Sequence, residues 1–296
     1  MTDHVLALDV GGTKIAAGLV DAQGSVLRRA VRPTPAHDAE LAWQAVADLV
    51  AEVLDGTVPS AVGIGSAGPV DTEAGTVSPI NINGWQAFPL RDRVQALLPG
   101  VLVSLAGDGL CIALGEHWLG AGRGSRFMVG MVVSTGVGGG LVLDGKPFGG
   151  RTGNAGHIGH VVAEPDGRPC TCGGRGCVET VAGGPNMVRW AREQGWTGSD
   201  AIALAGSARA GDPIAAAAFE RCGRAVGLSI AAAAAICDLD LAVIGGGIAK
   251  TDDLLFAPVR RTLRIHAGLS FIKDLKVVKA ERDDSGLIGA AALVLL

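Results

Sequence analysis

The amino-acid sequence predicts an α/β fold made of two domains. Short apolar runs typical of β-strands alternate along the chain with longer runs typical of helices. Two of the strand-like runs end in glycine-rich turns, at residues 9–14 and 134–140. The 296 residues are enough for one large or two medium domains, and the repeated order of strand, glycine turn and strand favours two related units that grip one polyphosphate.

The first domain, residues 1–117, is expected to begin with a meander of three strands. Apolar runs predict these strands at residues 5–8, 15–20 and 26–31, then a helix at 39–53 and a strand at 61–65. The turn at 66–71 either presents backbone amides to a ligand or only reverses the chain. A strand at 101–105 and a helix at 109–119 complete the domain. This succession is typical of an α/β unit.

The second domain, residues 118–296, opens with the same order of elements. Strands are predicted at 127–133 and 141–143, on either side of the second glycine turn. Helices follow from residue 186 and at 213–237, then a strand at 239–244 that runs into the glycines at 245–247. This third glycine turn suits either an adenosine contact or a plain helix entry. The apolar helix at 286–296 is expected to pack back on the first domain.

The first glycine turn has the sequence Asp-x-Gly-Gly-Thr-Lys. Asp9 ends an apolar strand, and Gly11 and Gly12 let the backbone approach a ligand without a Cβ clash. The next segment is again apolar and turns at Ala22-Gln-Gly24, which predicts a β-hairpin. A dinucleotide-binding fingerprint or a Walker loop would instead lead into a helix and needs a different glycine spacing, so neither is present.

Composition limits the classes of function. A formal net charge of −4 and a pI near 5.9 give no general attraction to nucleic acid. The first residues lack a basic and apolar leader, and the longest apolar stretch, 228–237, is too short to cross a bilayer. We therefore expect a cytoplasmic protein without a membrane partner. In a reducing compartment, clustered cysteines indicate a metal site more than disulfides.

One such cluster stands out. His160 precedes Cys170, Cys172 and Cys177, so that one imidazole and three thiolates lie close together in the sequence. Three sulfurs and one nitrogen form the closed tetrahedral set of a structural zinc site, and the intervening glycines let a short loop fold around an ion. A zinc-ribbon module for nucleic acid would need a second ligand pair and a basic face, which the sequence lacks.

Together these motifs resemble the ROK family of bacterial sugar kinases and repressors, in the sugar kinase, Hsp70 and actin superfamily. The resemblance rests on the Asp-x-Gly-Gly-Thr-Lys turn and on the His, Cys-x-Cys-Gly-x-x-Gly-Cys-x-Glu run, and it covers nearly the whole chain. It implies two actin-like (ribonuclease H-like) α/β domains with mixed sheets around a central cleft. It also implies ATP-dependent phosphorylation of a hexose with Mg²⁺, domain closure on the sugar, and a homodimer or homotetramer.

The catalytic carboxylate is expected at Asp108. Phosphoryl transfer to an alcohol needs a carboxylate that accepts the hydroxyl proton, and Asp108 lies between a strand and a helix, where it can face a cleft. On local grounds an aspartate there is equally a helix N-cap. The stretch from Gly107 to Glu116 is similar to the ROK segment that carries the catalytic aspartate, and this resemblance assigns Asp108 as the base.

The resemblance also implies the remaining site residues. Asp9 is expected to meet Mg²⁺, directly or through water, while Lys14 either assists or is simply solvated. Glu179 accepts hydrogen bonds from sugar hydroxyls, or is only a carboxylate favoured by a helix dipole. The nucleotide contacts are expected at Asp9, Gly11, Gly12, Thr13, Lys14, Thr135, Gly136, Gly138 and Gly246. The sugar contacts are expected at Gly68, Asp108, His157, His160 and Glu179, and zinc at His160, Cys170, Cys172 and Cys177.

Two positions depart from the family pattern. ROK kinases usually have Asn-Asp where this chain has Gly107-Asp108, and a glutamate where it has His157. The asparagine generally addresses the 3-hydroxyl of the sugar, so glycine removes a partner and opens space near carbon 3. An unpaired polar group costs about 1 to 3 kcal/mol. An ammonium at carbon 3, near Asp108 and Glu179, would gain charge-assisted hydrogen bonds, so a 3-amino-hexose such as kanosamine is the expected substrate.

Two other functions are compatible with the motifs. ROK transcriptional regulators carry an N-terminal helix-turn-helix, whereas here the strand of the first glycine turn begins at Val5. A non-catalytic sugar-binding protein is the second alternative, and the retained Asp9 and Asp108 count against it. The sequence alone does not define the sugar, the preferred phosphoryl donor or the oligomeric state.

Overall fold

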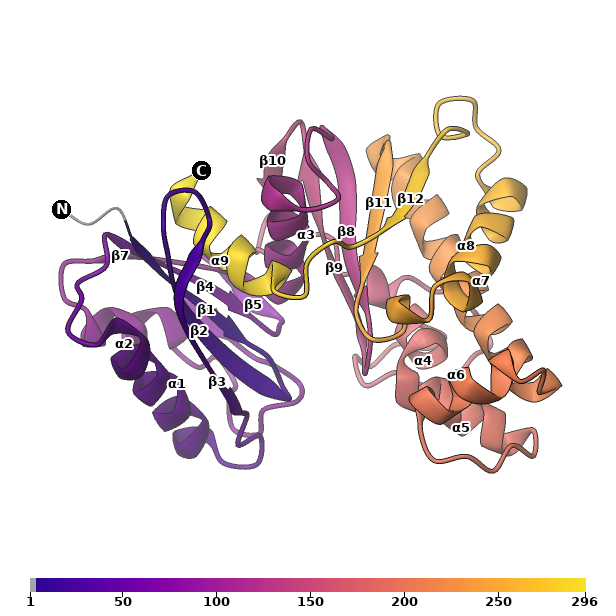
Figure 1. Cartoon of the computed structure of the whole chain (residues 1–296), viewed down its shortest axis with the longest axis horizontal. Helices are drawn as coiled ribbons and strands as arrows, with labels where there is room; N and C mark the ends of the chain where they lie inside the picture. The colour runs from indigo at the N-terminus through magenta and orange to yellow at the C-terminus, as the bar shows by residue number, and fades with distance from the viewer. Residues whose placement is uncertain (1–3) are drawn as a thin grey trace.

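The computed structural model describes residues 4–296 and contains two α/β halves, each built on a five-stranded sheet (Figure 1). Residues 1–3, which belong to the segment judged to lack a leader, lie outside the described residues. The first sheet has the order β3-β2-β1-β4-β7. Its strands are β1 (Val5–Val10), β2 (Lys14–Val20), β3 (Val26–Pro33), β4 (Ala61–Ser66) and β7 (Leu102–Gly107).

The second sheet repeats this topology, with the order β10-β9-β8-β11-β12. In each sheet the first strand is antiparallel to the next one in sequence and parallel to a later one, with β1 corresponding to β8. The two sheets are therefore mixed and related, as the sequence predicted. Its strands are β8 (Phe127–Val133), β9 (Val137–Leu143), β10 (Lys146–Phe148), β11 (Leu241–Gly245) and β12 (Lys276–Lys279).

Helices cover the outer faces of both sheets. On the first sheet lies α1 (Ala39–Leu54), which begins at the N-cap Asp38 because the side chain of this aspartate accepts hydrogen bonds from two backbone amides. The apolar face of α1 packs into the core of the first half. The shorter α2 (Leu90–Leu97) follows a small hairpin of β5 (Val70–Asp71) and β6 (Thr76–Val77).

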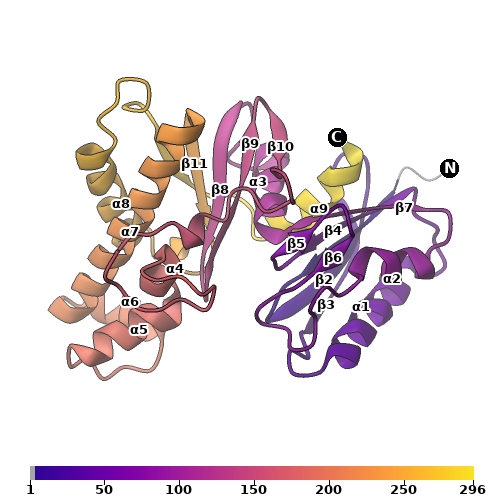
Figure 2. The ribbon, with the colours of Figure 1, turned by 180° about the vertical axis from the view of Figure 1, so that it is seen from behind.

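The outer layer of the second half is larger (Figure 2). Its longest helix, α7, is rich in alanine and packs against α8, α4 and α6. None of the helices in residues 4–296 is long and apolar enough to cross a membrane. The helices of this layer are α4 (Val178–Ala182), α5 (Gly184–Glu193), α6 (Ala201–Arg209), α7 (Pro213–Cys237) and α8 (Asp253–His266).

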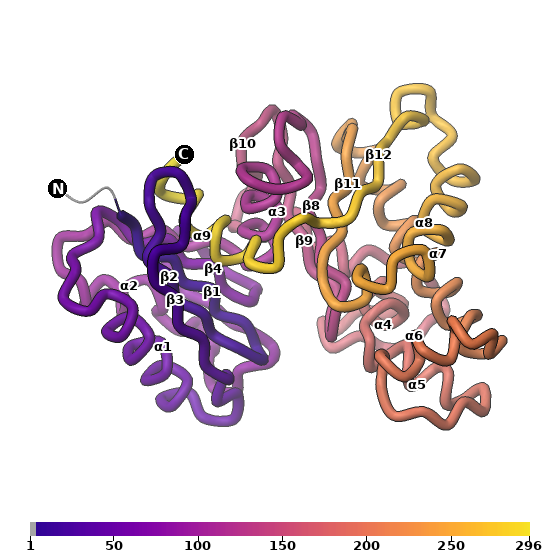
Figure 3. Tube along the Cα trace, in the orientation of Figure 1, coloured from indigo at the N-terminus to yellow at the C-terminus, as the bar shows by residue number. Residues whose placement is uncertain are grey.

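Two helices lie between the sheets. The chain leaves β7 through α3 (Asp108–Leu119), which packs on β8 and β9, and it leaves β12 through α9 (Ser285–Leu295), which packs on β1 and β4. Each helix thus starts from one sheet and covers the other, and Figure 3 shows the second of these crossings as the segment between β12 and α9. The predicted division of the chain at residues 117 and 118 stays a prediction.

Glycines bring α3 and α9 close to the sheets and to each other. A Cβ at Gly63 would lie 1.7 Å from the carbonyl oxygen of Ala290, and one at Gly289 would lie 1.6 Å from that of Cys111. No side chain fits in such gaps, so these positions require glycine. Gly63 and Gly289 therefore allow α9 to pack closely on β4 and on α3.

The structure differs from the sequence prediction in the second glycine turn. The predicted strand 141–143 is longer, and β9 already begins at Val137. Residues 138–140 therefore pair with β8, because backbone hydrogen bonding to a neighbouring strand outweighs the turn tendency of glycine. The turn itself is confined to Ser134, Thr135 and Gly136.

Candidate active site

The two aspartates singled out from the sequence lie at the same edge of the first sheet. β1, β4 and β7 are parallel, and the register places Asp9 beside Gly65 and Gly65 beside Ala106. Asp108 is the first residue of α3, directly after β7. The carboxyl ends of neighbouring parallel strands are a common place for ligand sites.

Asp108 is not the N-cap of α3. Gly107 occupies the cap position without a side-chain hydrogen bond, while Oδ1 of Asp108 accepts a hydrogen bond from the amide of Gly109 at 2.7 Å. Burial and the nearby charge of Asp9 raise the pKa of Asp108 to about 7, against the lowering effect of that hydrogen bond. Burial also raises the pKa of Asp9, which Lys14 and Arg29 partly offset. A carboxylate with a pKa near neutrality is suited to proton transfer at neutral pH.

The first glycine turn joins β1 to β2 as a hairpin. The amide of Gly11 donates to the carbonyl oxygen of Lys14 at 3.0 Å, and the hydroxyl of Thr34 donates to the carbonyl oxygen of Gly11 at 2.7 Å. A Cβ at Gly12 would lie 1.9 Å from Nδ2 of Asn81. Thr34, directly after β3, thus holds the turn, and Asn81 in the loop before α2 lies close to it. Thr13 and Lys14 are exposed.

The second glycine turn is bound to Glu179. Oε2 of Glu179 accepts a hydrogen bond from the amide of Val137 at 2.9 Å and would lie 2.6 Å from a Cβ at Gly136. The amide of Gly184 donates to the carbonyl oxygen of Ser134 at 2.8 Å. The start of α4 and the start of α5 are therefore fixed to this turn, with Gly138 just beyond it in β9.

The third glycine turn lies beside the second. Gly246 has a φ of +93°, and a Cβ there would lie 2.4 Å from the carbonyl oxygen of Val133. Ser134, Thr135 and Gly247 border a cavity of about 900 Å³, whose other walls come from α5, α6 and the residues after β11. Val188 and Ile202 offer apolar surface there, and Arg189 offers a positive charge. This combination suits a nucleotide.

Four of the five expected sugar contacts also meet. A Cβ at Gly68 would lie 3.4 Å from Cε1 of His157, and the rings of His157 and His160 stand edge to face with centroids 5.9 Å apart. Burial lowers the pKa of His157, as does His160, while Glu179 raises it. The structure thus brings Gly68, His157, His160 and Glu179 to one region.

Gly107 is buried, and its surroundings leave room for a Cβ atom. Of the described atoms, only the carbonyl oxygen of Gly153 comes within 4 Å of a Cβ built at Gly107, at 3.9 Å. The backbone of Gly107 has a φ of −67° and a ψ of 144°, which any residue adopts. A Cβ atom is therefore tolerated at Gly107, directly before Asp108.

The four metal-ligand candidates converge. Their donor atoms lie within 4.8 Å of one another, with Nδ1 of His160 3.7 Å from Sγ of Cys170, and Sγ of Cys172 3.7 Å from Sγ of Cys177. A regular tetrahedron with zinc–sulfur bonds of about 2.3 Å has edges of about 3.8 Å, so this donor set fits Zn²⁺. Cys170 and Cys177 are buried, and Cys172 is exposed.

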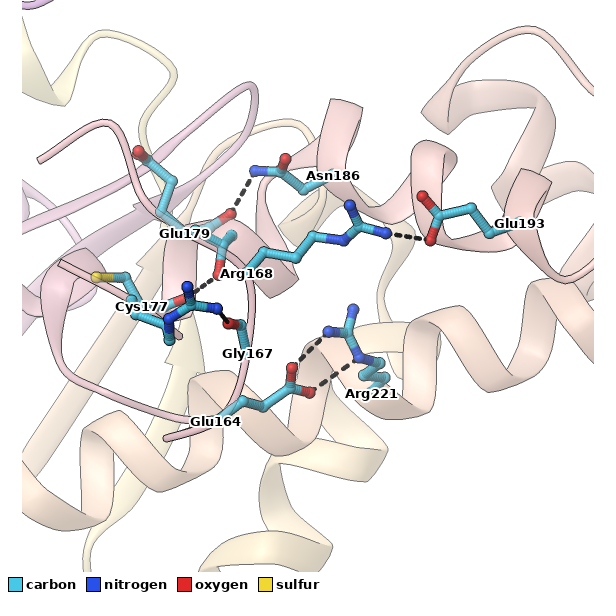
Figure 4. A network of polar contacts seen from close by, with 10 residues as sticks. Glu164, Gly167, Arg168, Cys177, Glu179, Asn186, Glu193 and Arg221 are labelled. Atoms are coloured by element: carbon cyan, nitrogen blue, oxygen red, sulfur yellow. Dashed lines mark hydrogen bonds and ion pairs between the residues drawn. The ribbon is translucent and has the colours of Figure 1, made fainter. Parts of the chain in front are cut away.

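Ion pairs fasten the loop that holds these ligands (Figure 4). Glu164 pairs with Arg221 of α7 at 2.6 Å, and Arg168 pairs with Glu193 of α5 at 2.5 Å. The side chain of Asn186 donates to the carbonyl oxygen of Glu179 at 2.7 Å. Glu179 is therefore positioned from both the cysteine loop and the helical layer.

Sequence reasoning missed three parts of this site. Asn81 lies over the first glycine turn, and only the Asn-Ile-Asn-Gly segment that starts there gave a signal. Asn154 exchanges hydrogen bonds with the backbone of Val70, at 2.9 Å to the amide and 2.6 Å to the carbonyl oxygen. The walls of the 900 Å³ cavity come from surface-like helices that no local pattern marks.

Two related α/β halves, each with a glycine turn after its first strand, and two half-buried aspartates at one sheet edge are the arrangement of a sugar kinase of the actin-like class. The chain belongs to the ROK family, whose sequence model matches residues 5–296.

The comparisons with known proteins agree. The glucokinase of Thermotoga maritima is 36% identical over 98% of this chain and 96% of its own length. An N-acetylmannosamine kinase of Yersinia pseudotuberculosis is 34% identical over 97% of this chain and 96% of its own. The crystal structure of a ROK family glucokinase from Streptomyces griseus, in complex with glucose and AMPPNP, is 34% identical and superposes with a TM-score of 0.85 over 98% of each chain.

Proposed function

We propose that this sugar kinase transfers the γ-phosphoryl group of ATP to the 6-hydroxyl of a hexose or amino-hexose, with Mg²⁺. Relatives that are glucokinases and N-acetylmannosamine kinases support this reaction. The observation that carries the proposal is the position of Asp108, half-buried near Asp9 at the sheet edge, with its pKa raised to about 7. A carboxylate in that state is able to accept a hydroxyl proton as the phosphoryl group is transferred.

Each part of the site then has a role. Asp108 orients the 6-hydroxyl and takes up its proton. Asp9 would hold Mg²⁺, directly or through water, and a bound Mg²⁺ supplies positive charge to the phosphates. The turns at Gly11–Thr13 and Thr135–Gly136 would offer backbone amides to the phosphates, apart from the Gly11 amide, which donates to the carbonyl oxygen of Lys14. Gly138 and Gly246 would flank the second turn. The adenosine would occupy the 900 Å³ cavity.

The sugar would lie between Asp108 and Glu179. Gly68, His157 and His160 border this region and would complete the pocket. One structural Zn²⁺ would be held by His160, Cys170, Cys172 and Cys177. These four ligands complete its tetrahedral coordination, and the ion would order the loop. Through this loop the metal site would fix Glu179 at the start of α4.

We further propose that the substrate is a 3-amino sugar, 3-amino-3-deoxyglucose (kanosamine). The support is the glycine at position 107, where family members carry asparagine, and the neighbouring carboxylate of Asp108. An ammonium group placed there makes charge-assisted hydrogen bonds, whereas a 3-hydroxyl loses its amide partner. His157 in place of glutamate removes a negative charge from the sugar region.

The test is ADP release by purified protein with Mg·ATP across a panel of sugars. The panel contains glucose, mannose, glucosamine, N-acetylglucosamine, N-acetylmannosamine and 3-amino-3-deoxyglucose, and Asp108→Asn is the control. Turnover of the 3-amino sugar well above glucose, lost in the control, supports both proposals. A preference for glucose keeps the kinase and refutes the amino-sugar specificity.

Absence of turnover on every sugar would favour a non-catalytic, regulatory sugar-binding protein. Direct sugar binding measured by calorimetry then separates that alternative from an untested substrate. We also propose a homodimer or homotetramer, as ROK enzymes commonly form, and light scattering of the purified chain measures this directly.

A further inference from the structure

Glu116 is a fully buried carboxylate in the middle layer of the protein. It lies on α3 and has an exposed fraction of 0%. Its oxygens accept four hydrogen bonds, from the amides of Ala121 (2.9 Å), Glu281 (3.1 Å) and Arg282 (3.1 Å) and from the hydroxyl of Ser285. All four donors are neutral. A buried polar group without hydrogen-bond partners is costly, and these four donors supply partners to both oxygens of Glu116.

The donors come from separate parts of the chain. Ala121 follows α3, the helix that crosses from the first sheet to the second. Glu281, Arg282 and Ser285 belong to the segment that crosses back from β12 to α9 (Figure 3). One carboxylate therefore binds together the only two helices that lie between the sheets in residues 4–296.

Each of these two helices begins at or beside one aspartate of the site. α3 begins at Asp108 itself. α9 begins at Ser285, and a Cβ at the next residue, Gly286, would lie 2.8 Å from Oδ2 of Asp9. A Cβ at Gly115, next to Glu116, would lie 2.1 Å from the carbonyl oxygen of Ser285. Any shift of the first turn of α9 against α3 therefore moves the surroundings of Asp9 relative to Asp108.

We propose that Glu116 is a positioning residue, which clasps the two crossings and thereby sets the placement of Asp9 against Asp108 for phosphoryl transfer. The inference rests on the proposed roles of these two aspartates. It predicts an effect on turnover rather than on substrate affinity, because the sugar region and the nucleotide cavity are lined by other residues.

Glu116→Gln is the sharpest variant. Glutamine keeps the shape of the side chain, but it turns one acceptor into an NH₂ group that faces backbone amides. We expect kcat to fall about tenfold or more, with KM for sugar and ATP within about threefold, since small misplacements of reacting groups are costly. Hydrogen exchange at the amides of residues 281–286 should become faster. Measurements are made well below the unfolding temperature of the variant.

Ser285→Ala removes a single donor and serves if Glu116→Gln does not fold. It should show the same selective loss of kcat to a smaller extent. Glu220→Gln, which breaks an exposed ion pair with Arg261, is the matched control for a glutamate on another helix. It should leave kcat, KM and the exchange of residues 281–286 unchanged.

The outcomes separate this inference from the proposed function. With active wild-type protein and inactive Asp108→Asn, a folded Glu116→Gln or Ser285→Ala of unchanged kcat overturns the positioning role. A rise in KM at constant kcat overturns it too. If the wild type turns over no sugar, the proposed function fails. Unchanged hydrogen exchange at the amides of residues 281–286 in Glu116→Gln would then overturn the inference that Glu116 holds the two crossing segments together.

Discussion

Replacing Asp108 by asparagine should abolish turnover and yet make the protein more stable at alkaline pH. The pKa of Asp108 rises from 3.8 to about 7, first because of burial and then because of Asp9. Since one pKa unit corresponds to about 1.4 kcal/mol, ionised Asp108 destabilises the folded state by about 4 kcal/mol. Asparagine has nearly the same shape and carries no charge, so it removes this cost.

The sign of the pH dependence follows from proton binding. The folded protein binds the Asp108 proton more tightly than the unfolded chain does, so it holds more protons between about pH 4 and pH 7. The free energy of unfolding of the wild type therefore decreases as the pH rises through that window, because the folded protein then loses the proton of Asp108. The advantage of Asp108→Asn should be near zero at pH 4 and reach about 2 to 4 kcal/mol at pH 8.

Urea unfolding of metal-free wild type and Asp108→Asn at pH 4.5 and pH 8 measures this difference. Asp274→Asn, which neutralises an exposed aspartate before β12, is the control for a general charge effect and should show no such gain. Equal stability of wild type and Asp108→Asn at pH 8 would refute the electrostatic reasoning. Residual turnover close to wild type would refute the role of Asp108 as the base, whose removal should cost about 10² to 10⁴ in rate.

Three further predictions concern the reaction, the metal and the sugar. Below a pH of about 7 kcat/KM should fall tenfold per pH unit, because protonated Asp108 no longer accepts a proton; a flat profile from pH 5 to 8 would contradict this. Chelation of zinc should lower both the unfolding temperature and kcat, and added Zn²⁺ should restore them. Atomic emission should give a zinc-to-protein ratio near one, and Cys172→Ser should reproduce the loss. Unaltered stability after complete metal removal would exclude a structural ion. Gly107→Asn is compatible with the backbone, and its Cβ meets no clash, so it should raise the ratio of kcat/KM for glucose over the 3-amino sugar about tenfold or more. A constant ratio would show that Gly107 does not set the specificity.

Local sequence was sufficient where the chemistry is local. The strand before Asp9 and the hairpin after Lys14 follow from apolar runs and a glycine turn, and the structure confirms them as β1 and as the hairpin of β2 and β3. The ligand set from His160 to Cys177 is contained in one loop, so its spacing alone predicts that the donors meet. Family resemblance added the two-domain actin-like fold.

The tertiary structure decided what depends on distant segments. Asp9 and Asp108 share a sheet edge only because β1, β4 and β7 align in parallel register. Asn81 reaches the first glycine turn from a loop with no regular structure. Glu116 reads in the sequence as one more helix residue, and its hydrogen bonds to the segment before α9 appear only when α3 and α9 are packed together.

Sequence by itself therefore determined the first glycine turn and the cysteine loop, because each depends on neighbouring residues and backbone preferences, while the choice of Asp108 as the base came from the family resemblance. Only the folded chain decided their relative placement. Sheet register, the close approach of helices at glycines, and the burial that raises the pKa of Asp108 arise from contacts between residues far apart in sequence, which no local pattern contains.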